Sequence, residues 1–121
     1  MRFLVVDDDA MVQQVCQGML RALNHSSIAV SDAVDAVQHL TESSLKFDCI
    51  ILDKGLPGLS GIELLGILEE WKISIPVILI SGGPLVTEGD ESADWAKFPF
   101  LAKPFTLSDL RSAIERLPFS G

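Results

Sequence analysis

Short apolar runs rich in β-branched residues recur along this chain of 121 residues, and most of them end on a polar or charged residue. Runs this short are typical of strands that are buried on both faces of a parallel sheet. Between the runs, apolar residues return at helical spacing. The pattern predicts strands at residues 2–7, 27–31, 49–53, 77–81 and 99–102.

The segments between the strands are predicted to be helices that bury one apolar stripe. Asp9 and Thr106 are expected to cap the first and last of them, and Pro118 is expected to end the last. Ser60 and Glu63 form a capping-box pattern for a helix that runs to about residue 71. The apolar positions expected to face the core are Val12, Val15, Cys16, Met19, Leu20, Leu23, Val37, Leu40, Leu107, Leu110, Ile114 and Leu117.

Strands that alternate with helices predict an α/β fold, a parallel sheet with helices on both faces. Right-handed crossovers leave few topologies, and we expect a flavodoxin-like, doubly wound five-stranded sheet of order 2-1-3-4-5. A single domain is expected over residues 1–121. Residues 82–97 contain three glycines and a proline, so the fourth helix is expected to be short or irregular.

Composition narrows the functional classes. The hydrophobic fraction of 48% argues for a packed core, and no apolar run approaches the roughly 20 residues that span a membrane. A cytoplasmic protein without a membrane partner is therefore expected. The net charge of −8 disfavours direct binding of nucleic acid. Cys16 and Cys49 have no basic neighbour in the sequence and are interpreted as buried structural residues.

Acidic residues stand where two of the predicted strands end. Asp7 and Asp8 follow the first apolar run, and Asp53 ends the third. In the predicted order these two strands are neighbours, and their carboxyl ends form the crevice where such folds bind ligands. Carboxylates gathered there repel one another, so we expect a hard divalent cation, Mg²⁺ (or Mn²⁺), between them. Asp8 and Asp53 are expected to bind it directly, and Asp7 through water.

Asp53 is also a candidate nucleophile, because a carboxylate can attack phosphorus and form an aspartyl phosphate. Ser81 ends the fourth predicted strand and Lys103 follows the fifth, so both would open on the same edge of the sheet. Lys103 would supply a fixed positive charge to the transferred phosphoryl oxygens, and Ser81 a hydroxyl donor. Together these residues predict a site for phosphoryl transfer.

Four motifs mark these strand ends: FLVVDDD at residues 3–9, ILD at 51–53 followed by LPGLSG at 56–61, LIS at 79–81, and AKPF at 102–105. In this order and at this spacing they resemble the receiver domain of bacterial two-component response regulators, over essentially the whole chain. The resemblance implies that Asp53 is the phosphoacceptor, fed by a sensor histidine kinase or a phosphotransfer protein. It also implies a downstream protein target or an effector domain outside these residues.

The same resemblance implies further roles. Gly55 would give its backbone carbonyl to the metal, and Ser81 and Phe100 would form the family's switch pair of a hydroxyl residue and an aromatic. Phe100 is equally open to a simple core role. The peptide between Lys103 and Pro104 would be cis, which proline tolerates.

The chain also departs from the family pattern. The family often has Asn or another side chain where this chain has Gly55, and Gly82 and Gly83 leave the mouth of the pocket open. The poor fourth helix lies on the family's usual output face.

Two alternatives to a phosphorylated signalling receiver remain open. A phosphohydrolase could use the same Asp53 nucleophile, but haloacid-dehalogenase-like phosphatases carry a second Asp two residues later, where this chain has Gly55. A degenerate receiver would bind a partner without being phosphorylated. That alternative requires a missing acid or lysine, and none is missing. The leading expectation is a signalling domain that is no enzyme beyond assisting its own phosphorylation and dephosphorylation.

Overall fold

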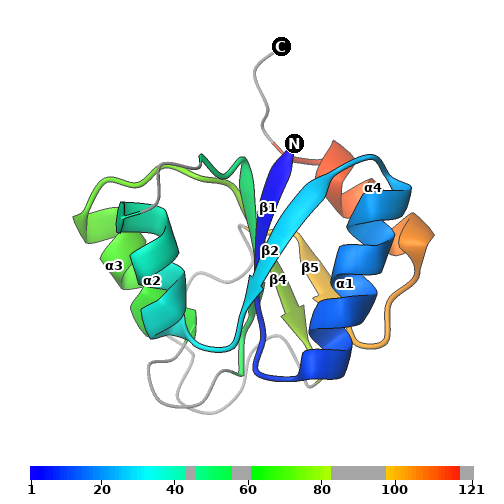
Figure 1. Ribbon diagram of the computed structural model, residues 1–121, viewed down its shortest axis with the longest axis horizontal. Coiled ribbons are helices and arrows are strands. Elements are labelled where there is room, and N and C mark those ends of the chain that lie inside the picture. The colour runs from blue at the N-terminus through cyan, green and yellow to red at the C-terminus, as the bar shows by residue number, and fades with distance from the viewer. Residues whose placement is uncertain (43–45, 56–60, 83–97, 118–121) are drawn as a thin grey trace.

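The computed structural model describes residues 1–42, 46–55, 61–82 and 98–117, and there it shows a five-stranded parallel sheet between two layers of helices (Figure 1). The strands are β1 (Arg2–Val6), β2 (Ser26–Val30), β3 (Cys49–Asp53), β4 (Val77–Ser81) and β5 (Phe100–Ala102). The helices are α1 (Ala10–Ala22), α2 (Ala33–Glu42), α3 (Gly61–Glu70) and α4 (Leu107–Glu115). The order β2-β1-β3-β4-β5 confirms the predicted flavodoxin-like topology.

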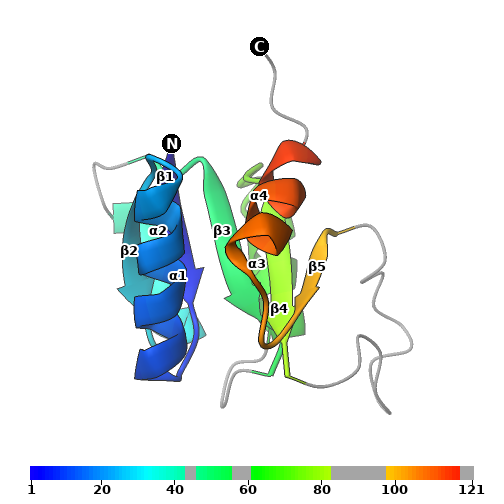
Figure 2. The same ribbon diagram turned by 90° about the vertical axis from the view of Figure 1, so that its right-hand side faces the viewer.

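The core consists of two apolar clusters, one on each face of the sheet. Successive side chains of a strand point to opposite faces, so β3 places Ile50 and Leu52 in one cluster and Cys49 and Ile51 in the other. Helices α2 and α3 cover the first face, and α1 and α4 cover the second (Figures 1 and 2). Because β3 is buried on both faces, its sequence is a continuous apolar run rather than an alternating one.

The two predicted helix caps that fall within the described residues, Asp9 and Thr106, are both present. The Asp9 side chain accepts hydrogen bonds from the backbone N–H groups of Met11 and Val12 at the start of α1. At the start of α4, Thr106 and Asp109 form a reciprocal capping box. These bonds satisfy N–H groups that have no partner within the helix, so each helix begins at a defined residue.

Two of the predicted core positions are exposed: Val15 is 47% exposed and Leu107 is 39% exposed. The side chain of Trp71 is also 51% exposed. At about 100° per residue, Val15 lies roughly 120° from the midpoint between the buried residues Cys16 and Leu20 of α1. Trp71 follows the last residue of α3, and Leu107 is the first residue of α4. At a helix end the next turn covers only one side of the residue, which leaves part of the side chain in water.

Some expectations fall outside the described residues. They are the capping box that rests on Ser60, the irregular fourth helix within 83–97, and the helix stop at Pro118. Among the helices that the structure does describe, none has the length and apolar character needed to span a membrane.

Candidate functional site

Strand register brings Asp7 and Asp53 together. Val6 is the partner of Leu52 where β1 and β3 pair, so the residue that follows each of them in the chain is an aspartate at the same level of the sheet. The two chains then separate, because the helix after β1 covers one face and the helix after β3 covers the other (Figure 1). A crevice at this point is expected of such a sheet.

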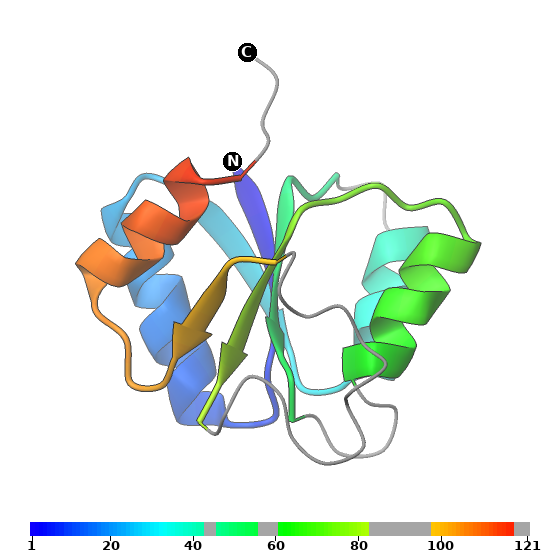
Figure 3. The same ribbon diagram turned by 180° about the vertical axis from the view of Figure 1, so that it is seen from behind.

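Ser81 and Lys103 complete the same edge. Ser81 is the partner of Ala102 where β4 and β5 pair, and the backbone N–H of Lys103 donates to the carbonyl oxygen of Ser81 over 2.8 Å. Figure 3 shows β4 and β5 from behind, with their arrowheads pointing toward this edge. The four strand ends named from the sequence therefore meet at one end of the sheet.

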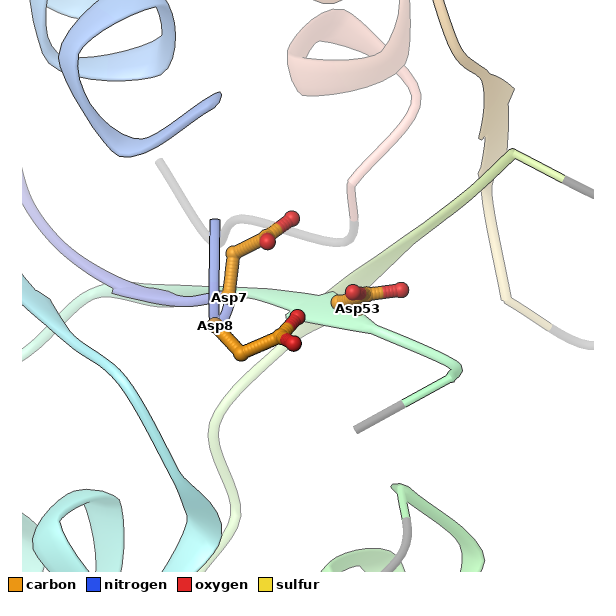
Figure 4. A group of neighbouring side chains, drawn as sticks. All are labelled: Asp7, Asp8 and Asp53. Atoms are coloured by element: carbon orange, nitrogen blue, oxygen red, sulfur yellow. The ribbon is translucent and has the colours of Figure 1, made fainter. Parts of the chain in front are cut away.

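Three carboxylates gather at this edge. Asp7, Asp8 and Asp53 each offer an oxygen, and these oxygens all lie within 4.8 Å of one another. In Figure 4 the Asp8 carboxylate extends toward Asp53, whereas that of Asp7 points to the opposite side of the strand. Asp7 is fully buried and Asp53 is 6% exposed, whereas Asp8 is open to solvent. Asp8 is thus the solvent-facing member of the group.

Lys103 contacts both buried carboxylates. Its Nζ lies 2.8 Å from Oδ2 of Asp7 and 3.3 Å from Oδ2 of Asp53. Partial burial lowers the pKa of Lys103 and is the largest single influence on it. The close contact with Asp7 and the charges of Asp53 and Asp7 together outweigh that burial, so the net pKa of Lys103 is raised. The ammonium group is therefore held in its charged form.

The pKa of Asp53 is raised above its usual value, first of all by burial. A hydrogen bond from the Gly55 N–H, 3.0 Å from Oδ1, lowers it. The charge of Asp7 raises it again, and the charge and hydrogen bond of Lys103 lower it. One ammonium group therefore does not fully offset burial beside a second carboxylate, and further positive charge would stabilise the ionised site.

The donor set fits a hard divalent cation. An octahedral Mg²⁺ with bonds of about 2.1 Å holds its ligand oxygens about 3 to 4.2 Å apart, close to the spread of the three aspartate oxygens. The oxygens that already accept hydrogen bonds or face Lys103 keep a second lone pair for a metal. All the candidate side-chain ligands are oxygens, which favours magnesium or manganese over softer metals.

The remaining predicted residues lie nearby. Ser81 is 8% exposed at the end of β4. Phe100 is half-buried, is the partner of Leu79, and packs against the cluster under α2 and α3. The Lys103–Pro104 peptide is cis. A Cβ added at Gly55 would lie 3.8 Å from Asp53 Oδ1, so the backbone there has room for a side chain.

The sequence interpretation missed one residue at this edge. Gln13 of α1 reaches the strand ends, and its Nε2 donates to the carbonyl oxygen of Asp7 over 2.6 Å. The only signal in the sequence is its place one turn into the helix that follows the aspartates. Glutamine is also common on helix surfaces, so its position alone does not distinguish it from its neighbour Gln14.

Comparison with models of known protein families shows which family the chain belongs to. The model of the response regulator receiver domain matches residues 3–115. The chain belongs to this family. As a receiver domain of two-component response regulators it is a signalling domain. Asp7, Asp8, Asp53 and Lys103 lie together at the carboxyl edge of its sheet.

Individual relatives agree with this assignment. The transcriptional regulatory protein PmrA of Pectobacterium parmentieri is 30% identical over 118 residues, which are 97% of this chain and 52% of the relative. The chain thus spans about half the length of that relative. The chemotaxis protein CheY of Pseudomonas aeruginosa is 27% identical over 119 residues, which are 97% of this chain and 95% of CheY.

A solved structure is similar over nearly its whole length. It is the receiver domain of a sensor histidine kinase from Pseudomonas aeruginosa, with a magnesium ion coordinated in its active site cleft. It is 28% identical to this chain, with a TM-score of 0.76, and the match covers 95% of this chain and 94% of that one.

Proposed function

We propose that this receiver accepts a phosphoryl group on Asp53 from the phosphohistidine of a sensor histidine kinase or a phosphotransfer protein, with Mg²⁺ bound beside it. The observation that carries the proposal is the placement of Lys103. Its ammonium group lies between the buried carboxylates of Asp7 and Asp53, at the edge where Asp8 adds a third. A nucleophile, a fixed cation and a set of oxygen ligands are then within a few ångströms of each other.

The transfer step follows from these positions. One oxygen of the Asp53 carboxylate attacks phosphorus, an O–P bond forms, and the P–N bond to the donor imidazole breaks. The imidazole leaves with the electron pair and takes up a proton. Lys103 holds its charge beside the Asp53 oxygens, where negative charge on the phosphoryl group has to be offset.

Asp8 and Asp53 would bind Mg²⁺ directly, Asp7 through water, and Gly55 through its backbone carbonyl. When bound, Mg²⁺ (or Mn²⁺) supplies positive charge to the phosphoryl oxygens. The fit of the three carboxylates supports this assignment, as does the magnesium in the similar receiver domain. Burial of Asp7 keeps its charge close to the other two carboxylates without exposing it to an incoming donor.

The signal would leave the site through the strand ends. The Ser81 hydroxyl would bind a phosphoryl oxygen on Asp53, and Phe100 would be the aromatic member of the switch pair. Support comes from the ladder between β4 and β5, in which Ser81 and Phe100 are two rungs apart. The output would reach a downstream protein target or an effector domain outside these residues.

The alternatives receive no support from the site. A degenerate receiver lacks one of the acids or the lysine, whereas here Asp7, Asp8, Asp53 and Lys103 are all present and gathered. A haloacid-dehalogenase-like phosphatase needs a general acid two residues after the nucleophile, and Gly55 has no side chain.

The test is phosphotransfer. Autophosphorylated kinases of the host, and separately acetyl phosphate, are mixed with the domain in the presence of Mg²⁺, and intact mass is recorded. We expect a mass gain of one phosphoryl group that EDTA prevents. Reduction of the acyl phosphate with borohydride followed by peptide mapping should place the modification at Asp53. Labelling at another residue, or labelling that persists in EDTA, would contradict the proposal.

A further inference from the structure

Asp8 is an exposed side chain, and yet a metal ligand needs a defined position. Among the residues that the structure describes, none donates a hydrogen bond to the Asp8 carboxylate. Its direction is therefore set by the backbone on either side of its Cα. We propose that Gln13 is a positioning residue that holds this backbone so that Asp8 faces the metal site, an inference that rests on the metal-dependent function proposed above.

The contacts of Gln13 carry the inference. Its Nε2 donates to the carbonyl oxygen of Asp7 over 2.6 Å and to that of Val30 over 3.0 Å. A weaker contact reaches Oγ of Ser31 at 3.2 Å. The two carbonyl oxygens can only accept hydrogen bonds, so the orientation of the Gln13 amide follows from its partners. One side chain of α1 thus ties together the ends of β1 and β2.

These bonds fix the first of the two peptide planes that flank Asp8. That plane contains the carbonyl of Asp7, which Gln13 holds. The second plane contains the N–H of Asp9, which donates to Oδ1 of Asp7 over 2.8 Å. With both planes held, the Cα–Cβ bond of Asp8 has a fixed direction. In Figure 4 its carboxylate accordingly extends toward Asp53.

The hydrogen bonds that hold these two peptide planes come from different parts of the fold. The bond from the Asp9 N–H lies within the group of aspartates, because its acceptor Asp7 is also the buried partner of Lys103. The bond from Gln13 comes from a helix whose start is fixed by the Asp9 cap and whose inner face is buried at Cys16 and Leu20. Half-buried Gln13 therefore transmits the rigid position of α1 to the peptide before Asp8.

The chain supplies a matched control. Gln14 is the same residue type, one position further along the same helix, and is exposed. Replacement by methionine keeps the length of either side chain and removes its donors. Only Gln13→Met loses the bonds to Asp7 and Val30, whereas both variants change helix propensity equally.

The experiment measures metal affinity rather than phosphorylation. Binding of Mn²⁺ is followed by the electron paramagnetic resonance signal of the free ion, at a temperature far below melting so that all variants are folded. We expect Gln13→Met to raise the Kd for Mn²⁺ about tenfold, which is typical when the support of a metal ligand is removed. Gln14→Met should leave the Kd unchanged. Loss of stability alone would not move the Kd of a fully folded protein.

A double-mutant cycle with Asp8→Asn locates the effect. If Gln13 acts through Asp8, Gln13→Met should weaken binding in the wild-type background and have no further effect when Asp8 is already Asn. An equal loss in both backgrounds would overturn the positioning role. Should Gln13→Met fail to fold, Gln13→Asn keeps the amide, falls short of the Asp7 carbonyl, and should show the same loss.

The outcomes separate this inference from the proposed function. A tenfold loss in Asp8→Asn with wild-type affinity in Gln13→Met would overturn the role of Gln13 and leave the metal site intact. Absence of Mn²⁺ binding by the wild-type domain would overturn the metal site, and the role of Gln13 with it.

Discussion

Strand β3 has an aspartate at each end, and the two differ in almost every physical respect. Asp48 precedes the strand, is exposed, and accepts a hydrogen bond of 2.7 Å from the backbone N–H of Arg2. Asp53 ends the strand, is 6% exposed, and shares its surroundings with two more carboxylates and Lys103. One residue type thus serves as a structural link at one edge of the sheet and as candidate chemistry at the other.

The contrast between the two aspartates shows at which edge of the sheet this fold buries charge. Among the described residues, the buried polar ones are Asp7, Asp53 and Ser81, and all three lie at the carboxyl edge. The crossovers after β1 and β3 leave toward opposite faces there, so the crevice is lined by strand ends. At the amino edge, Asp48 is exposed to solvent and accepts a hydrogen bond from the backbone N–H of Arg2, so its charge requires no buried cation. Burial beside like charges is what makes the carboxyl edge depend on a cation.

The largest expected effect compares these two aspartates directly. Asp53→Asn should abolish phosphoryl transfer from acetyl phosphate, because the amide is a poor nucleophile and cannot form the acyl phosphate. Asp48→Asn, at the other end of the same strand, should be labelled like the wild type. Intact mass after a fixed incubation measures both. Equal labelling of the two variants would remove the proposed distinction between the edges.

The second comparison removes a lysine at each edge. Lys103→Met leaves Asp7 and Asp53 buried without their cation, and should lower the free energy of unfolding by about 2–3 kcal/mol, less than for a fully buried pair because Lys103 is partly exposed. The side chain of Lys46 is on the surface, so Lys46→Met should change stability by less than about 0.5 kcal/mol. Urea unfolding in EDTA measures both. A similar loss in each would show that the ion pairs of Lys103 contribute little.

The third prediction concerns metal and stability. Mg²⁺ at about ten times its Kd should raise the free energy of unfolding by about 1.4 kcal/mol, because it binds the folded state only. Asp8→Asn should be more stable than the wild type without metal, since one repelling charge is gone, and should gain less from Mg²⁺. Asp48→Asn should gain as much as the wild type. Thermal melts with and without Mg²⁺ would refute the site if Asp8→Asn gained equally.

The smallest effect concerns the two thiols. Burial, and then the charge of Asp7, raise the pKa of Cys16 to about 11, and burial raises that of Cys49 to about 12. Each thiol has a higher pKa in the folded state than in the unfolded chain, so its full contribution to the free energy of unfolding is present below the usual value of 9.0. That contribution falls as pH rises from 9.0 toward 11 for Cys16 and toward 12 for Cys49.

At pH 8 both thiols should therefore react with iodoacetamide far more slowly in the folded domain than in urea, as mass spectrometry can measure. Fast native alkylation of Cys16 alone would indicate that the carboxyl edge opens locally. Fast alkylation of Cys49 would place such opening at the start of β3, at the amino edge.

Much of this molecule could be predicted from its sequence. Continuous apolar runs identify strands buried on both faces, and their alternation with helical segments leaves few topologies. Since parallel strands end at one edge, the residues that terminate the runs predict a common site. Asp7, Asp53, Ser81 and Lys103 were found in this way, and the structure places all four at that edge.

Other features depended on tertiary structure. Spacing along the chain gives the position of a residue within its element, but not the rotation of a helix against the sheet. The expectation for Val15 was therefore wrong, and Gln13 could not be told from Gln14. Lys103 contacts two aspartates at once only because β3 pairs directly with β1 on one side and is joined to β5 through β4 on the other. The residues that terminate the apolar runs predict which charges share an edge of the sheet, whereas packing decides which of them are buried, paired and held in place.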